Sequence, residues 1–141
     1  MTSHTVYNLF VYGSLRKGFQ SNAYEYISRF FTLVGNAKVK GRLVDMGTYP
    51  AGVPAEGEQY IIGELYQVKN SHEFSWAMGQ LDDYEGVNAE SEEERHYRRA
   101  ITDVYCNDMI LQAWIYWYHG DTSGRLVIES GDILQYMAGK Q

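Results

Sequence analysis

The chain has 141 residues, of which 45% are apolar and 21% are charged, and its formal net charge at pH 7 is −6. This length and this balance exclude a disordered chain and fit a single domain, residues 1–141, that buries its own hydrophobic core. The negative net charge and the scattered cations argue against nucleic acid as a partner, because binding to a phosphate backbone needs clustered positive charge.

The first part of the chain contains a predicted strand followed by a predicted helix. Residues 6–12 form a nearly continuous apolar run, which is typical of a buried strand. Asn22 and Glu25 have the spacing of a capping box and predict the start of a helix. Gly35 is placed to end that helix. The apolar face of the helix would consist of Ile27, Phe30, Phe31 and Val34.

The central part contains two predicted strands separated by a predicted loop. Residues 37–46 alternate between charged side chains and apolar or small ones, which predicts a half-exposed strand. Residues 46–59, MGTYPAGVPAEGEQ, contain both prolines of the chain and are expected to form a long loop. Residues 60–68, YIIGELYQV, predict a further strand.

The last part contains a second helix, a hairpin and a short third helix. Asn70 and Glu73 repeat the capping-box spacing, and the helix that they start is expected to run to about Tyr84. The acidic stretch that follows is most simply a solvated loop. Residues 97–106 and 109–118 predict two strands joined by a tight turn at residues 107 and 108, and Asp132 can cap a final helix. This order of elements predicts an α+β domain built on a curled, mostly antiparallel sheet.

The cysteine content and the apolar runs indicate the cellular compartment in which the protein is expected. Cys106 is the only cysteine, which excludes an intramolecular disulfide and fits a reducing compartment. Its apolar, strand-like surroundings favour a buried core thiol over a nucleophile. The longest apolar run, AWIYWY, is too short to cross a bilayer, and no signal peptide is visible. We expect a soluble, cytoplasmic protein with no membrane partner.

The carboxyl end of the second predicted helix carries an unusual concentration of acids. Asp82, Asp83 and Glu85 stand where the helix macrodipole is negative, at a cost of about 0.3–1 kcal/mol each. One interpretation is a solvated acidic turn, and the other is a carboxylate whose raised pKa suits proton transfer near neutral pH. Glu85 is favoured for that role because it stands where the helix breaks, whereas Asp82 and Asp83 fit exposed positions.

The turn after the first strand is a second candidate site. Successive main-chain amides in the turn Gly13-Ser14-Leu15 could form a small anion-binding concavity, and Gly13 would let a ligand approach the backbone. The surrounding sequence lacks a phosphate-binding motif, so a carboxylate or a developing oxyanion fits better than a nucleotide. The alternative is a plain turn.

Other catalytic arrangements have less support. Ser14 as a nucleophile would need a nearby base, and the spacing of the four histidines singles out no partner for it. No pair of histidines has metal-ligand spacing and no Cys-x-x-Cys motif exists, so we expect no metal site.

An ordered set of motifs resembles the γ-glutamylcyclotransferase-like family, in its short AIG2-like or γ-glutamylamine cyclotransferase branch. The set consists of FVYGSLRKG near the N-terminus, YPAG at 49–52, GELYQV at 63–68, LDDYEGV followed by HYRRAITDV, and SGD at 130–132. It spans nearly the whole chain in the family's order. The resemblance implies a small, partly closed β-barrel with flanking helices, and an enzyme that cyclises a γ-glutamyl group to 5-oxoproline without a cofactor.

The resemblance also implies roles for individual residues. Glu85 would be the catalytic glutamate, and Tyr97 would be the tyrosine that begins the following strand. Tyr116 is a weaker match to a tyrosine in a later strand, and Arg16 would supplement the positive charge at the turn. The main chain of the family's substrate-binding loop falls on Tyr12, Gly13, Ser14 and Leu15.

The choice of substrate and the alternative functions stay open at this point. The acidic insertion, residues 89–95, departs from the family pattern, has no assigned role and borders the expected pocket. A glutathione-specific branch also uses Tyr-Gly-Ser-Leu, but in longer chains. The leading hypothesis is a γ-glutamylamine or γ-glutamyl-amino-acid cyclotransferase. The alternatives are a non-catalytic binding module for a small carboxylate metabolite, and an amidase that uses Ser14. The pathway and the oligomeric state are left open.

Overall fold

The structure is a computed structural model that describes residues 6–13, 22–47, 50–55, 57–85 and 97–138. Its strands are β1 (Asn8–Val11), β2 (Phe31–Lys40), β3 (Arg42–Asp45), β4 (Pro50–Val53), β5 (Tyr60–Val68), β6 (Tyr97–Cys106), β7 (Met109–Tyr118) and β8 (Leu126–Val127). Its helices are α1 (Asn22–Phe30), the 3₁₀ helix η2 (Ser71–Glu73), α2 (Phe74–Glu85) and α3 (Ile133–Ala138).

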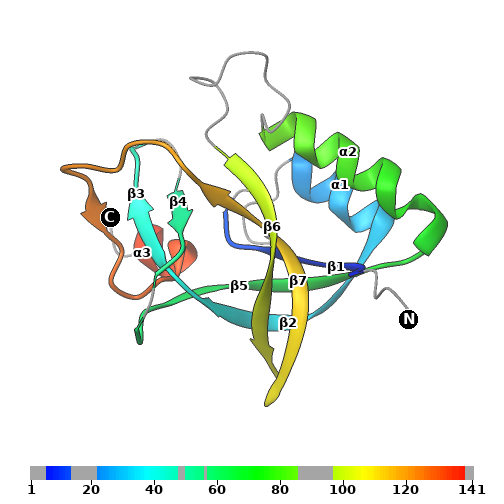
Figure 1. The fold of residues 1–141 in the computed structure, drawn as a ribbon, viewed down its shortest axis with the longest axis horizontal. Coiled ribbons are helices and arrows are strands. Elements are labelled where there is room, and N and C mark those ends of the chain that lie inside the picture. Colours follow the sequence, from blue (N-terminus) through cyan, green and yellow to red (C-terminus); the bar gives the residue numbers. More distant parts are fainter. Residues whose placement is uncertain (1–5, 14–21, 48–49, 56, 86–96, 139–141) are drawn as a thin grey trace.

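Five strands form a closed barrel in the order β1-β5-β2-β6-β7 (Figure 1). Neighbours in this order pair antiparallel, and a parallel pairing of Leu9 with Trp114 closes the barrel between β1 and β7. Helices α1 and α2 lie side by side against one end of the barrel (Figure 1). The predicted α+β class, with a mostly antiparallel barrel-like sheet and flanking helices, is therefore confirmed.

A second, smaller sheet with the order β4-β3-β8 lies with α3 at the other end of the molecule (Figure 1). Strand β4 falls inside residues 46–59, so the prediction of one long loop there was wrong. Pro50 is compatible with this strand because it is the first residue of an edge strand, where a missing N–H costs least. The two-residue strand β8 was not predicted.

The boundary between α1 and β2 also differs from the prediction. The helix ends at Phe30, and Phe31 through Lys40 pair with β5 instead of continuing the helix to Gly35. Phe31 is fully buried as expected, but it is buried as a strand residue. The pairing shifts register between Leu33 and Gly35, which marks a β-bulge there. The predicted strand 37–46 is split into β2 and β3 at residue 41.

The hairpin of β6 and β7 has the predicted bounds. Asn107 and Asp108 have φ angles of 51° and 62°, as a two-residue turn with both central residues left-handed requires. Strand β5 also matches its prediction. Cys106 is a buried, free thiol whose Sγ donates to the Asn36 carbonyl, which confirms the core interpretation.

Two of the described helices, η2 and α3, begin where polar side chains accept from main-chain amides. The side chain of Asn70 accepts from the His72 amide at the start of η2, and Asp132 accepts from the amides of Leu134 and Gln135 at the start of α3. The described helices include none that is long and apolar enough to cross a membrane.

The barrel strands bury side chains on both faces because the interior is packed and the helices cover part of the exterior. Phe10 and Tyr12 point to the interior cluster, whereas Leu9 and Val11 belong to the cluster beneath the helices. The same alternation on β7 puts Trp117 inside the barrel and Tyr116 under α2. Residues of β1 and β7 that could form a site therefore divide between the barrel interior and the surface beneath the helices.

Candidate active site

The residues selected from the sequence fall in four segments of the fold. Tyr12 and Gly13 follow β1, Tyr97 begins β6, and Tyr116 lies near the end of β7. Ser14, Leu15 and Arg16 lie outside the described residues. Glu85 is the last residue of α2, and its side chain lies outside the described part of the chain.

Tyr12 is held in place from two sides. Its ring is buried in the barrel interior, and its hydroxyl donates to the main-chain carbonyl of Tyr116. The same hydroxyl oxygen accepts from the Gly52 amide at 3.2 Å. Tyr12 thus fixes the end of β1 relative to β7 and β4, and with it the point where the candidate substrate loop begins.

Gly52 explains why the YPAG motif ends in glycine. A Cβ built at this position would lie 2.7 Å from Cζ of Tyr12 and 2.9 Å from its hydroxyl oxygen. Contacts this short are not seen for real Cβ atoms, so any larger residue would displace the Tyr12 ring. The hydrogen bond between Gly52 and Tyr12 therefore depends on the missing side chain.

Tyr97 extends from the start of β6 to β4. Its hydroxyl donates to the Pro50 carbonyl at 3.2 Å. Its ring packs edge-on against Tyr118, its cross-strand partner, with ring centroids 5.3 Å apart. Tyr118 is thus an aromatic neighbour with which Tyr97 pairs.

Pro50 is the point where the Tyr12–Gly13 segment and the start of β6 meet. A Cβ built at Gly13 would lie 3.5 Å from the Pro50 ring, an ordinary van der Waals contact. Because the Tyr97 hydroxyl bonds to the carbonyl of the same proline, Gly13 and Tyr97 flank one residue of β4. The start of the predicted substrate loop and the tyrosine after the acidic stretch are therefore neighbours in space.

The carboxyl end of α2 is attached to the barrel through Asp82. Both of its oxygens bind the Arg99 guanidinium, with Nε–Oδ1 and Nη2–Oδ2 distances of 2.8 and 2.9 Å. The Tyr116 hydroxyl donates to Oδ1 at 2.8 Å. Asp82 is only 7% exposed, so its predicted exposed position was wrong, whereas Asp83 is exposed as expected. The positive charge of Arg99 also interacts favourably with the negative, carboxyl-terminal end of the α2 macrodipole. It thereby offsets the unfavourable position of the acids there.

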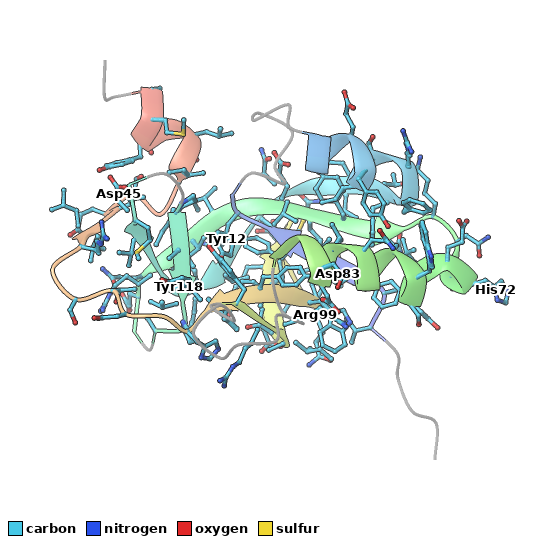
Figure 2. The ribbon with its side chains drawn as sticks, turned by 90° about the horizontal axis from the view of Figure 1, so that it is seen from above. Tyr12, Asp45, His72, Asp83, Arg99 and Tyr118 are labelled. Carbon is cyan, nitrogen blue, oxygen red and sulfur yellow. The ribbon has the colours of Figure 1, made fainter. Side chains whose placement is uncertain are left out.

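Arg99 has a second contact that holds its side chain. Its Cζ lies 4.5 Å from the centroid of the Trp114 ring, which places the guanidinium between an aromatic face and a carboxylate. Figure 2 shows Arg99 against the part of α2 that carries Asp83, with Tyr12 and Tyr118 further toward β3 and β4.

Sequence reasoning missed Asp82 and Arg99 as members of the site, although two signals were present. Met78, Asp82 and Glu85 follow the spacing of one helix face, so the apolar face of α2 continues into its acidic end. Arg99 lies two residues after Tyr97 on the same side of a strand.

The histidines, the possible metal ligands and the groove among the described residues do not belong to this candidate site. His72 lies at the opposite end of the α2 segment from Asp83 (Figure 2). Burial and the nearby charge of Arg98 lower the pKa of His119, so this imidazole is neutral at pH 7. Among the described residues, no group of three or more His, Cys, Asp or Glu side chains could hold a metal ion. A shallow groove beside the turn of the β6–β7 hairpin is not lined by any described candidate residue.

The Tyr97→Phe substitution tests whether the hydroxyl of this residue matters. We expect kcat/KM to fall about 2–10-fold, because one hydrogen bond that anchors β4 beside Gly13 is lost. Steady-state kinetics would measure the change, with Tyr105→Phe, at the far end of the same strand, as the control. Unchanged kinetics would leave Tyr97 with a packing role against Tyr118 only.

Comparison with solved structures defines the class of fold. The chain matches the crystal structure of an AIG2-like protein from Mus musculus with a TM-score of 0.65 and 23% sequence identity, over 92% of this chain and 90% of that one. At this identity the match shows the fold alone: a small α+β barrel of the AIG2-like type.

Sequence comparison then identifies the family. The model of the family described as gamma-glutamyl cyclotransferase, AIG2-like, matches residues 9–135. The Escherichia coli K12 protein YtfP, a gamma-glutamylcyclotransferase family protein, is 31% identical over 127 residues, which cover 89% of this chain and 95% of YtfP. The gamma-L-glutamyl-butirosin B gamma-glutamyl cyclotransferase of Niallia circulans is 38% identical over 79 residues, 56% of this chain and 47% of that protein. The chain belongs to the AIG2-like γ-glutamylcyclotransferase family and is an enzyme of that type.

Proposed function

We propose that this protein cyclises the γ-glutamyl part of a γ-glutamyl amine or γ-glutamyl amino acid to 5-oxoproline and releases the free amine, without a cofactor. The observation that carries the proposal is the convergence of Gly13 and Tyr97 on Pro50, together with the attachment of the end of α2 to β6 and β7 through Asp82. Arg99 lies about 7 Å along β6 from Tyr97, and it binds Asp82, about 4.5 Å along the helix axis from Glu85. These contacts support one shared site for the substrate loop and the catalytic glutamate.

The proposed reaction needs no enzyme nucleophile. The substrate's own α-amine attacks the γ-carbonyl carbon, a C–N bond forms to close the five-membered ring, and the original amide C–N bond breaks. The α-nitrogen loses two protons as it changes from an ammonium to the lactam N–H, and the leaving amine takes up both and departs as an ammonium, so atoms and charges balance without water. Holding the substrate in the ring-closing conformer can supply roughly 7–11 kcal/mol of the barrier in favourable intramolecular cases.

The residues of the site have complementary tasks in this proposal. Glu85 carries protons from the α-nitrogen to the leaving amine, acting as the base for ring closure and as the acid for departure of the amine. The main-chain amides of Gly13, Ser14 and Leu15 bind the substrate α-carboxylate or the developing oxyanion, and Arg16 adds positive charge. Tyr97 lies at the rim of the site, against the same proline as Gly13.

Assays of 5-oxoproline release decide between this reaction and a binding module. γ-Glutamyl dipeptides, γ-glutamyl-ε-lysine and glutathione would each be incubated with the purified protein, with the Glu85→Gln variant as the background control. Release from one of the first two supports the proposed function, and turnover of glutathione alone would move the protein to the other branch. No 5-oxoproline from any substrate, together with measurable binding of a small carboxylate, would favour the binding module.

Gly13→Ala tests whether a ligand approaches the backbone at this position. The added methyl group would make only an ordinary 3.5 Å contact with Pro50, so we expect little change in the free energy of unfolding. A substrate held against the main chain would be displaced, and KM should rise about 10-fold or more. The measurements are substrate kinetics and thermal unfolding of the same preparation. An unchanged KM would remove Gly13 from the substrate cradle.

A further inference from the structure

Tyr116 connects the two segments to which the proposed function assigns substrate binding and proton transfer. Its main-chain carbonyl accepts from the Tyr12 hydroxyl, just before the substrate loop. Its own hydroxyl donates to Asp82 Oδ1 at 2.8 Å, one turn before Glu85. Tyr116 is only 4% exposed, so both contacts lie away from solvent. A single strand residue therefore links the start of the loop to the end of α2.

Arg99 reinforces this link from the neighbouring strand. Arg99 and Tyr116 are direct cross-strand partners in the β6–β7 hairpin, so both side chains leave the barrel on the same face. They converge on one carboxylate, which receives a total of three hydrogen bonds from them. The Trp114 ring under the guanidinium limits the other orientations that Arg99 can take.

The position of this attachment matters because helix ends are the least constrained part of a helix. Asp82 and Glu85 are three positions apart, so they are neighbours on one helix face. Fixing the Asp82 carboxylate fixes the last turn of α2 against β6 and β7. A change of about 1 Å in the placement of a catalytic group can reduce a rate by about 10²-fold.

We propose that Asp82, Arg99 and Tyr116 form a positioning network that holds the end of α2, and with it Glu85, at a set place relative to the Tyr12–Gly13 segment. This inference rests on the proposed function for its kinetic consequence. The Tyr116 hydroxyl is thereby assigned a positioning role, whereas the family resemblance implies that Tyr116 binds substrate.

The test uses Tyr116→Phe, which keeps the ring and the main-chain carbonyl and removes the hydroxyl that donates to Asp82. We expect kcat to fall about 10-fold with KM within about twofold of the wild type, because the substrate loop keeps its anchor. Amide hydrogen exchange in the last turn of α2 should become about 5–10-fold faster, as the loss of one hydrogen bond allows. The matched control is Tyr136→Phe, which removes a tyrosine hydroxyl that donates to the Asp45 carboxylate at 2.7 Å on the opposite side of the fold.

The Arg99→Lys substitution tests whether the paired hydrogen bonds to Asp82 matter, or only the positive charge of residue 99. Lysine keeps the positive charge but cannot make the two parallel bonds to Asp82, so kcat should fall as in Tyr116→Phe. A lysine variant with wild-type kcat would contradict a positioning role for the paired bonds.

The outcomes distinguish this inference from the proposed function. Exchange in α2 that is the same in Tyr116→Phe and Tyr136→Phe overturns the network, whatever the activity of the wild type. An active wild type with an equally active Tyr116→Phe variant also overturns it and leaves the proposed function intact. A wild type that releases no 5-oxoproline overturns the proposed function, and faster exchange in Tyr116→Phe would then still support the attachment of α2.

Discussion

Replacing Glu85 with glutamine should lower the rate of 5-oxoproline release by about 10²–10⁴-fold, the usual contribution of a positioned general acid or base. The substitution keeps the size of the side chain and removes its ability to accept and return a proton. Substrate binding should change little, because the main-chain amides of the loop are unaffected. Single-turnover kinetics and equilibrium binding of the same substrate measure the two effects separately.

The stability of this variant gives an independent check on the role of Glu85. A charge at the carboxyl end of α2 opposes the helix macrodipole, so its removal should leave the free energy of unfolding unchanged or raise it by up to about 1 kcal/mol. Asp83→Asn is the matched control, since it removes an exposed charge from the same helix turn. We expect that control to have a similar effect on stability and wild-type turnover. A destabilised but fully active Glu85→Gln variant would assign the residue a structural role instead.

The local sequence pattern was sufficient to predict the bounds of strands whose pairing partners are close in sequence. The β6–β7 hairpin was predicted to the residue because its alternation and its Asn107-Asp108 turn are both local signals. The end of α1 was not predicted correctly, because the apolar residues after Phe30 fit a helix face as well as a strand. Pairing with β5, more than 25 residues further along the chain, decides between them. The strand β4 is hidden in a proline- and glycine-rich stretch for the same reason.

The candidate site shows the same division between local and long-range information. Glu85 and Gly13 were selected from features of their own segments: a helix end with misplaced acids, and a glycine turn after a strand. The burial of Asp82 depends on Arg99 and Tyr116, which are 17 and 34 residues away in sequence. The register of β6 and β7, which follows from the predicted two-residue turn, puts those two side chains on one face. A single sequence does not show that α2 packs on this face and brings Asp82 to them.

Gly63→Ala should be the most destabilising glycine substitution in the barrel wall, and it tests how the barrel sets up the site. A Cβ at Gly63 would overlap the main-chain carbonyl oxygen of Val11 and would lie 2.6 Å from Cζ of Phe10. The obstacle is partly backbone, so β1 itself must move away from β5. We expect a loss of about 3 kcal/mol in the free energy of unfolding, the upper part of the usual range for overpacking. This corresponds to a fall of roughly 10 °C in Tm for a chain of this size.

The control for this prediction is a glycine-to-alanine substitution in α2, at Gly79. A Cβ at Gly79, inside α2, would meet no atom of the described residues within 4 Å outside the helix's own backbone, so Gly79→Ala should stabilise the protein by about 0.5–1 kcal/mol through the higher helix propensity of alanine. The folded fraction of Gly63→Ala should also bind substrate less well than the control, because β1 carries Tyr12 and Gly13 at its end. Chemical unfolding and substrate affinity, measured on both variants, test the link. A Gly63→Ala protein with the stability of Gly79→Ala would show that β1 can shift freely, and the site would then need another anchor for its substrate loop.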